Sequence, residues 1–463
     1  MFLAFLGLAM AVALVDPRRG WLLALVVGVL QDPVRKMTPG HSPMFILAIA
    51  AVYGVVVFGA LAKLRDAAAR FRTEYRDLYR LFIIFFWFLV LAALNGLVTF
   101  GLTNWKAPAL ALFVYLLPLP AILLGYLLTR NDRDITRLLT FYAAITSVAL
   151  IAVPLEFWNE NLPFLGTVGM AQDWIRHLPG VQVRLLSGTF RGPDIMAWHA
   201  AMLCMIGLTM IVRKGFPRGW LWMGVSSWGF LCCLMSGRRK MLYMIAVFAA
   251  VFLIRFLRRF SIAQVSALAG TALSLWLIVD QMAGGKKSAI YTRSAGTSQG
   301  EILKRLEGGL LGTFRQAGLT GLGLGAATQG TRHLVKPGTV GTWQEGGAGK
   351  LAVELGFPAL IFLLFFGVIA ARRMWRIAHA PRLDPPAAVL PLALLALIAA
   401  NFASFLVSHQ PFSDPYLVLM NAYLIGALFA TQSMNEPLQR PEPVPAVAQP
   451  QLAGVAPQPL GVR

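Results

Sequence analysis

Apolar runs long enough to cross a lipid bilayer follow one another along this chain, separated by short polar connections, as far as residue 281. About 20 apolar residues span the hydrocarbon core as a helix, because a helix satisfies its own backbone hydrogen bonds where no water is present. Charged residues make up 13% of the chain and apolar residues 57%, whereas an ordinary soluble domain has about 25% charged residues. We therefore expect an all-α, polytopic helical membrane protein.

The apolar runs predict about 12–13 transmembrane helices. The first two runs are short and could pair as a hairpin. The first run is expected to be retained rather than cleaved as a signal peptide, because no cationic segment precedes it. The expected spans are 1–15, 20–31, 43–62, 81–100, 107–128, 135–157, 194–212, 219–235, 241–257, 263–280, 351–371, 387–407 and 413–431.

Basic residues indicate the orientation, since cytoplasmic connections carry an excess of Lys and Arg. The connection 63–80 contains six basic and three acidic residues and is assigned to the cytoplasm. Alternation of the spans then places the arginine-rich connections after residues 129, 212, 254 and 371 on the same side. It leaves the segments 158–193, 236–240 and 281–350 on the outer side.

The chain divides into four regions by composition. These are N-terminal transmembrane helices (1–280), a long outer loop (281–350), C-terminal transmembrane helices (351–431) and a proline-rich tail (432–463) expected to be disordered and cytoplasmic. The outer loop has nine basic and three acidic residues, and its pattern predicts an amphipathic helix over about 299–317. The glycines of 318–325 favour a tight turn that lets the backbone approach a ligand over a plain loop.

Several chemistries find little support in the sequence. The three cysteines all lie within expected spans and read as packing residues, with no metal spacing and no disulfide framework. The expected outer loops carry no paired aspartates, so neither a metal nor another cofactor is expected. The net charge of +21 mostly reflects arginines that flank the membrane, so membrane lipids are expected partners and nucleic acid is not.

One short connection carries three successive cations, Arg238, Arg239 and Lys240, between two apolar runs. The connection is too short to be a domain, and alternation places it on the outer side, where cations are less usual. Such a cluster needs an anionic partner. Phosphate is the abundant anion at that surface, on a lipid headgroup or on a lipid-linked substrate.

Three sequence patterns occur in a fixed order. Leu-Leu-Ser-Gly-Thr-Phe-Arg-Gly-Pro-Asp (185–194) precedes one span, Ser-Gly-Arg-Arg-Lys (236–240) joins two spans, and Gly-Leu-Gly-Leu-Gly (321–325) is followed by Trp-Gln-Glu-Gly-Gly-Ala-Gly-Lys-Leu-Ala-Val-Glu-Leu-Gly (343–356). Together these patterns resemble the O-antigen ligase and O-antigen polymerase superfamily. Its members are membrane glycosyltransferases of GT-C type that act on polyprenyl-diphosphate-linked glycans. The resemblance covers most of residues 1–431.

The resemblance implies an inverting, metal-independent glycosyl transfer at the periplasmic face of the bacterial inner membrane, without a cofactor. The implied donor is an undecaprenyl-diphosphate-linked oligosaccharide and the acceptor is a glycan or a lipid, with glycan-assembly and export proteins as further partners. The family's arginines that bind the diphosphate correspond to Arg191, Arg238 and Arg239. Many members carry a His-Asn pair nine residues before the Glu that corresponds to Glu354, where this chain has Glu345. This departure favours a polysaccharide polymerase, or a ligase with an unusual acceptor, over a strict lipopolysaccharide ligase.

The chemistry of such a transfer assigns roles to these side chains. Breaking the bond between the sugar C1 and the diphosphate develops negative charge, which the guanidinium groups of Arg191 and Arg238 would stabilise. The acceptor hydroxyl loses a proton as it attacks, and Glu345 is the candidate general base. The candidate substrate-binding residues are Arg239, Lys240, Arg184, Arg315, His333 and Lys350.

Each assignment has a simpler alternative. Arg191 could be an interfacial anchor that reaches lipid phosphate, and the 236–240 connection would be an ordinary cytoplasmic loop if the spans were miscounted. Glu345 could cap the helix that follows, with His333 as an alternative base. The other assignments are structural: a buried hydrogen-bonding role for His199, a structural role for His409 beside Asp414, and a local ion pair between Lys350 and Glu354.

A flippase or transporter of lipid-linked glycans is the rival class of function. Such a protein would also be basic and would cross the membrane many times. It would be expected to place ionisable residues within its spans, around a central cavity. Here the expected spans carry few charges, and the charges gather on one side. The sequence therefore favours an enzyme over a transporter.

Overall fold

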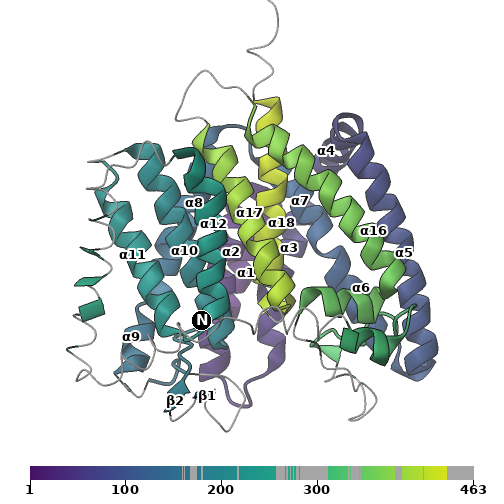
Figure 1. Cartoon of the computed structure of the whole chain (residues 1–463), viewed down its shortest axis with the longest axis horizontal. Helices are drawn as coiled ribbons and strands as arrows, with labels where there is room; N and C mark the ends of the chain where they lie inside the picture. The colour runs from purple at the N-terminus through teal and green to yellow at the C-terminus, as the bar shows by residue number, and fades with distance from the viewer. Residues whose placement is uncertain are drawn as a thin grey trace, which may run out of the picture.

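The computed structural model describes residues 1–158, 160, 162–166, 175–178, 181–215, 218–256, 311–331, 334, 344, 346–380, 388–409 and 411–434, together with isolated residues between 266 and 281. Long helices lie side by side in a bundle (Figure 1). The predicted all-α class is confirmed, with one addition that the sequence did not predict. Two short strands in the expected outer segment pair antiparallel, with Ile175 opposite Arg184.

The elements follow the chain in this order. They are α1 (Phe2–Val15), α2 (Pro17–Met37), η1 (Pro43–Leu47), α3 (Ala48–Gly59), α4 (Leu61–Glu74), α5 (Arg76–Phe100), η2 (Leu102–Asn104), α6 (Lys106–Leu116), α7 (Pro118–Leu128), α8 (Asp132–Ala149), α9 (Ala152–Phe157), β1 (Ile175–Leu178), β2 (Val181–Arg184), α10 (Pro193–Lys214), α11 (Trp220–Met235), α12 (Arg239–Phe256), α16 (Gly347–Ala378), α17 (Val389–Val407), η5 (Pro411–Ser413) and α18 (Pro415–Ser433). A further helical segment covers 311–317.

Among the described residues, seven helices are long and apolar enough to cross a membrane, or eight if one bent pair counts as a single span. That pair is Met44–Gly59 and Leu61–Glu74, which meet at 78°. The apolar helices α1 and α11 are shorter, and α2 and α12 have 21 and 18 residues but carry several charges. These four elements account for much of the difference from the 12–13 expected spans. Most of the expected span 263–280 lies outside the described residues.

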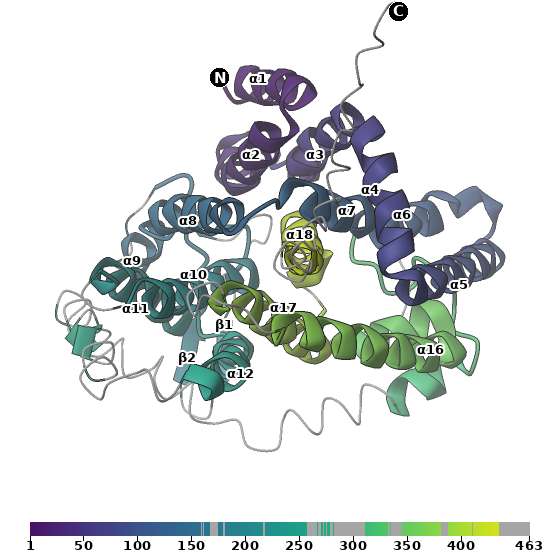
Figure 2. The same ribbon diagram turned by 90° about the horizontal axis from the view of Figure 1, so that it is seen from above.

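Burial separates the inner helices from the outer ones. The span formed by α10 is 94% buried, whereas that of α5 is 17% buried. α10 packs against α8, α11, α12 and α17, and Figure 2 shows it enclosed by its neighbours. The exposed face of α5 carries large apolar side chains, Trp87, Leu91 and Val98 among them. A helix that is apolar all round is buried in protein or lipid, so α10 forms the interior and α5 faces the bilayer.

Small residues let two central helices approach closely. A Cβ atom on Gly125 of α7 would collide with the carbonyl oxygen of Tyr423, and one on Gly426 of α18 would collide with that of Ile122. Lipid is as apolar as leucine, so membrane helices associate through such close packing rather than through the hydrophobic effect. α18 therefore lies against α7 near the middle of the bundle (Figure 2).

The glycine-rich turn of 318–325 packs against the helices of the bundle. The N–H group of Leu322 donates to the carbonyl of Val353 (2.7 Å), and that of Leu324 donates to the carbonyl of Ala92 (2.9 Å). Gly323 has φ 88° and lies against the backbone of Gly96 in α5, where a side chain would collide. The predicted close approach of the backbone is present, and its partners in the structure are α5 and α16. An approach of this turn to a ligand stays a prediction.

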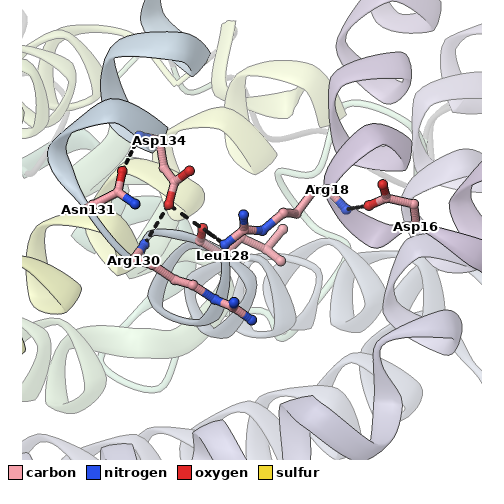
Figure 3. A network of polar contacts seen from close by, with 6 residues as sticks. All are labelled: Asp16, Arg18, Leu128, Arg130, Asn131 and Asp134. Atoms are coloured by element: carbon pink, nitrogen blue, oxygen red, sulfur yellow. Dashed lines mark hydrogen bonds and ion pairs between the residues drawn. The ribbon is translucent and has the colours of Figure 1, made fainter.

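Figure 3 shows how two turns are joined at one end of the bundle. Asp16 caps α2 by accepting the N–H group of Arg18 (2.9 Å). The Arg18 guanidinium reaches the carbonyl of Leu128 (3.3 Å) and the carboxylate of Asp134 (3.7 Å). Asp134 also accepts the N–H group of Arg130 and donates its own N–H group to Asn131. The Arg18 side chain is 42% exposed, so this contact contributes little energy but places the α1–α2 and α7–α8 turns at the same end.

The segments predicted to lie on the two sides of the membrane are found at opposite ends of the helix bundle. In Figure 1, α4, which lies in the connection predicted to be cytoplasmic, is at the top of the bundle, and β1 and β2 are at the bottom. The alternation derived from the arginines agrees with this arrangement. We call the end that contains β1 and β2 the outer end, following that prediction.

The first testable prediction concerns this orientation. A cysteine at Glu160, exposed at the outer end, should react with a membrane-impermeant thiol reagent added to intact spheroplasts, and a cysteine at Ala69 of α4 should not. The native Cys204, Cys232 and Cys233 are at most 4% exposed, so they should give little background. Labelling of Ala69→Cys without labelling of Glu160→Cys would invert the topology.

Candidate functional site

The motif 185–194 is held by two helices from elsewhere in the chain. The Glu156 carboxylate in α9 accepts the N–H groups of Ser187 (2.9 Å) and Gly188 (2.5 Å). The Lys36 ammonium, near the end of α2, donates to the carbonyl of Gly188 (2.8 Å). Gly188 has φ 55°, which a residue with a side chain rarely adopts. The segment that carries Arg191 is thus anchored before α10 begins.

Arg191 lies between two aspartates. Its guanidinium pairs with the carboxylate of Asp414 at 2.7 Å, and its backbone N–H group donates to Asp32 of α2 at 3.0 Å. Asp414 also caps α18 by accepting the N–H group of Tyr416 (2.7 Å). In the described part of the chain, Nη1 of Arg191 is buried and has no hydrogen-bond partner. The side chain is 17% exposed, so it points into the protein, which does not fit the interfacial anchor.

Arg238 and Lys240 share a third aspartate. The Asp194 carboxylate in the first turn of α10 pairs with the Arg238 guanidinium (3.1 Å) and with the Lys240 ammonium (2.7 Å). Lys240 also donates to the hydroxyl of Ser408 (2.7 Å). A helix N-terminus favours a negative charge, so Asp194 is well placed to hold two cations. The Ser-Gly-Arg-Arg-Lys connection therefore folds onto the start of α10, three residues from Arg191.

His409 brings a third part of the chain to this region. Its Nε2 lies 2.7 Å from the carbonyl oxygen of Gln344. Burial, with the positive charges of Lys350 and Lys240, lowers the pKa of His409 to about 4. The imidazole is therefore neutral at pH 7, and it donates through Nε2 because a carbonyl only accepts. This arrangement agrees with a structural role, and it places Lys240 and Lys350 within electrostatic reach of one histidine.

Lys350 and Glu354 do not form the ion pair that their spacing indicated. The Lys350 ammonium lies over the ring of Tyr115, 5.5 Å from its centroid. The Glu354 carboxylate is fully buried and accepts the hydroxyl groups of Tyr115 (2.8 Å) and Thr328 (2.7 Å) and the N–H groups of Gly325 and Ala327. Glu354 thus fastens the glycine-rich turn to α16.

The other predicted site residues are placed as follows. Arg239 is 8% exposed at the start of α12. Arg184 is exposed at the end of β2, and Arg315 is exposed in the helical segment 311–317. Glu345 and His333 lie outside the described residues, so their roles as base and ligand stay predictions. Of the predicted site residues, the structure brings Arg238 and Lys240 together at Asp194, three residues from Arg191. Arg239 adjoins them in the sequence, and Lys350 lies within electrostatic reach of His409.

Sequence reasoning missed the acidic partners. We define the ion-pair cluster as Asp32, Arg191, Asp194, Arg238, Lys240 and Asp414. A buried cation needs a partner that offsets its desolvation, and the three aspartates supply it. A signal was present in the sequence, because each aspartate adjoins a proline at the end of an apolar run: Asp32-Pro33, Pro193-Asp194 and Asp414-Pro415.

The remaining polar groups fit structural or binding roles better than metal coordination. His199 is 1% exposed, lies 2.9 Å from the Tyr142 hydroxyl through Nδ1 and stacks on Phe190. This confirms a buried hydrogen-bonding role for His199. Among the described residues, no three His, Cys, Asp or Glu side chains are grouped so that they could hold a metal ion. The ion-pair cluster instead offers guanidinium and ammonium groups, whose chemistry suits a phosphate.

Comparison with known proteins adds no relative. No family model matches the sequence, and no curated protein matches it.

Proposed function

We propose that this protein is a membrane glycosyltransferase that polymerises or transfers a glycan from an undecaprenyl-diphosphate carrier at the periplasmic face of the bacterial inner membrane. One observation carries the proposal. Arg238, which directly precedes α12, and Lys240, in the first turn of α12, pair with Asp194 in the first turn of α10. Arg191 lies three residues before that aspartate and pairs with Asp414 at the cap of α18. Convergent cations near a membrane surface suit a lipid-linked diphosphate.

The proposed reaction is a single inverting displacement. The acceptor hydroxyl oxygen attacks C1 of the donor sugar, and the bond between C1 and the diphosphate oxygen breaks with its electron pair on the diphosphate. Arg191 and Arg238 stabilise the charge that develops there. Glu345 takes the proton of the acceptor hydroxyl. Guanidinium groups held in place before the reaction need no reorganisation, which makes the stabilisation larger than in water.

The aspartates of the cluster orient its cations and compete with a diphosphate for them. Asp414 and Asp194 hold the guanidinium groups in fixed orientations without substrate. A diphosphate carries the same charge sign and the same bidentate oxygens as these carboxylates, so it competes with them for Arg238 and Lys240. Nη1 of Arg191, without a hydrogen-bond partner in the described part of the chain, is a further donor for a phosphate oxygen.

Two alternatives remain as proposals of lower rank. An O-antigen ligase would use the same donor site with a lipid or other acceptor. A flippase or transporter of lipid-linked glycan would need ionisable groups along a central path through the membrane. The cluster lies instead at helix ends, near the end of α2, in the first turns of α10 and α12 and at the cap of α18. This position favours the enzyme.

The proposed base gives the second testable prediction. Glu345→Gln should still insert and bind the donor, because the arginines are untouched, but turnover should fall by roughly a hundredfold or more. The measurement is consumption of a purified undecaprenyl-diphosphate oligosaccharide by the reconstituted protein, together with thermal stability of the same sample. A capping role would instead lower stability by about 1 kcal/mol and preserve turnover.

A control variant and an assay of donor transport complete this experiment. Glu160→Gln, an exposed change at the outer end, should keep wild-type turnover and stability. If the wild-type protein moves the donor across the bilayer without cleaving the sugar–diphosphate bond, the protein is a transporter and not a glycosyltransferase. If Glu345→Gln turns over at the wild-type rate, Glu345 is not the base, and His333→Ala becomes the next variant.

A further inference from the structure

A second site lies at the opposite end of the bundle from the ion-pair cluster. A groove of about 560 Å³ runs between the first turns of α8 and the end of α10. Its lining combines cations with hydroxyl and apolar groups: Arg133, Thr136, Arg137, Thr140, Phe141 and Ala144 of α8, and Arg213 of α10. Of the three arginines, only Arg213 has described side-chain partners: its guanidinium donates a hydrogen bond to the hydroxyl of Thr136 and pairs with the carboxylate of Asp132.

Two of the three arginines that line the groove have no described partner for their positive charge. Arg133 and Arg137 are exposed and one helical turn apart on α8, and no described residue forms an ion pair or hydrogen bond with either guanidinium. Asp132 offsets part of the charge of Arg213 at 4.0 Å. The groove therefore has a net positive charge, and a negatively charged ligand complements it.

The same face of α8 becomes apolar away from the arginines. Thr140, Ala144 and Val148 continue the exposed stripe at helical spacing, and Val148 is 68% exposed. α8 lies at the edge of the bundle in Figure 2. The three side chains of the stripe are exposed, so no described helix covers them. A phospholipid has the matching order of groups, with a phosphate at the membrane surface and acyl chains below it. A free phosphate would have no use for the apolar stripe.

We propose that this groove binds an anionic phospholipid, with its phosphate against Arg133 and Arg137 and an acyl chain along the exposed stripe of α8. Arg213 lies at the edge of the headgroup site and joins it to α10. Basic pockets between transmembrane helices on the cytoplasmic side hold anionic headgroups in this way. The inference does not depend on the proposed function, because the ligand, the helix faces and the end of the bundle differ from those of the glycan site.

Lipid retention tests the proposal directly. Full-length protein is purified in mixed micelles with equal amounts of dioleoyl-phosphatidylglycerol and dioleoyl-phosphatidylcholine, which share acyl chains and differ in net charge, and bound lipid is counted by native mass spectrometry. Wild type should retain phosphatidylglycerol over phosphatidylcholine by about tenfold, as expected for several arginines near one headgroup. The Arg133→Gln/Arg137→Gln variant should lose that preference.

The matched control is Arg372→Gln/Arg376→Gln, a pair of exposed arginines one turn apart near the end of α16 and outside the groove. This control should keep the preference of wild type. Equal loss in both double variants, or no preference in wild type, would refute a specific site.

A further variant, Ala144→Trp, keeps the arginines and fills the apolar part of the groove, so it should also lose the lipid. If millimolar inorganic phosphate displaces phosphatidylglycerol, or Ala144→Trp retains it, the groove is an anion site and the lipid proposal is wrong.

Discussion

Replacing Glu354 by leucine is expected to lower the free energy of unfolding by about 3–5 kcal/mol, the cost of removing the acceptor from a buried polar network. The carboxylate accepts hydrogen bonds from Tyr115 and Thr328 and from the N–H groups of Gly325 and Ala327. Leucine has a similar volume and no acceptor. All four donors would lose this partner in a region from which water is largely excluded.

Glutamine at position 354 separates the polar network from simple packing. Its carbonyl oxygen can still accept from the turn, and the Tyr115 hydroxyl can accept from its amide, so the loss should be about 1 kcal/mol. We expect Glu354→Leu, but not Glu354→Gln, to expose the 318–331 turn to proteolysis, because the turn is fastened to α16 through this side chain. Thermal and denaturant unfolding in detergent measure the difference.

The control for this prediction is Glu160→Leu, an exposed carboxylate outside any described network. It should unfold like wild type. If Glu354→Leu is as stable as Glu354→Gln, the network does not hold the turn, and the packing of Gly323 on Gly96 would have to account for its position.

Much of the fold followed from hydropathy, since apolar runs such as 81–100 and 387–407 cross the bundle as helices. Other elements were missed for physical reasons. The expected span 43–62 contains a sharp bend at Ala60, between α3 and α4, which no periodicity in the sequence indicates. α12 begins with Arg239 and Lys240, so its charges belong to the helix and not to a loop before it. The two-stranded hairpin escaped notice because four-residue strands leave a weak pattern.

The candidate site was predictable in part. The cations stood out because Arg238 and Lys240 interrupt two apolar runs, and Arg191 lies in a glycine- and proline-containing motif. Their partners Asp32 and Asp414 are far away in sequence, so only the packing of α2 and α18 brings them to Arg191. Long-range pairing of this kind is a property of the tertiary structure. Buried cations require acidic partners, but the sequence does not tell which carboxylates supply them.

The arginines of the ion-pair cluster give the second large effect. Arg191→Lys and Arg238→Lys should each lose about 2–4 kcal/mol of transition-state stabilisation, which is roughly 30- to 900-fold in rate, in the same donor-consumption assay. Both variants keep the positive charge. Lysine replaces a planar group with two parallel N–H donors by a single ammonium, so it can pair with Asp414 or Asp194 but cannot also hold a phosphate in the same geometry.

Stability must be measured on the same samples, because both arginines are part of buried ion pairs. Because lysine retains the positive charge, the loss of folding free energy should be about 1–2 kcal/mol. This loss is smaller than the loss expected when one partner of the ion pair is removed altogether. Arg372→Lys is the matched control, since Arg372 is exposed near the end of α16 and lies outside the ion-pair cluster. Its turnover should stay within about twofold of that of wild type.

The pattern across these variants separates catalysis from architecture. If Arg191→Lys and Arg238→Lys fold well and lose turnover while Arg372→Lys keeps it, the cluster acts on the diphosphate. If the same two variants lose stability in proportion to turnover, the arginines serve to pin α10 to α2, α12 and α18 through Asp32, Asp194 and Asp414. Wild-type turnover in both stable variants would remove the cluster from the reaction, because a bidentate donor and a point charge cannot be equivalent at a diphosphate.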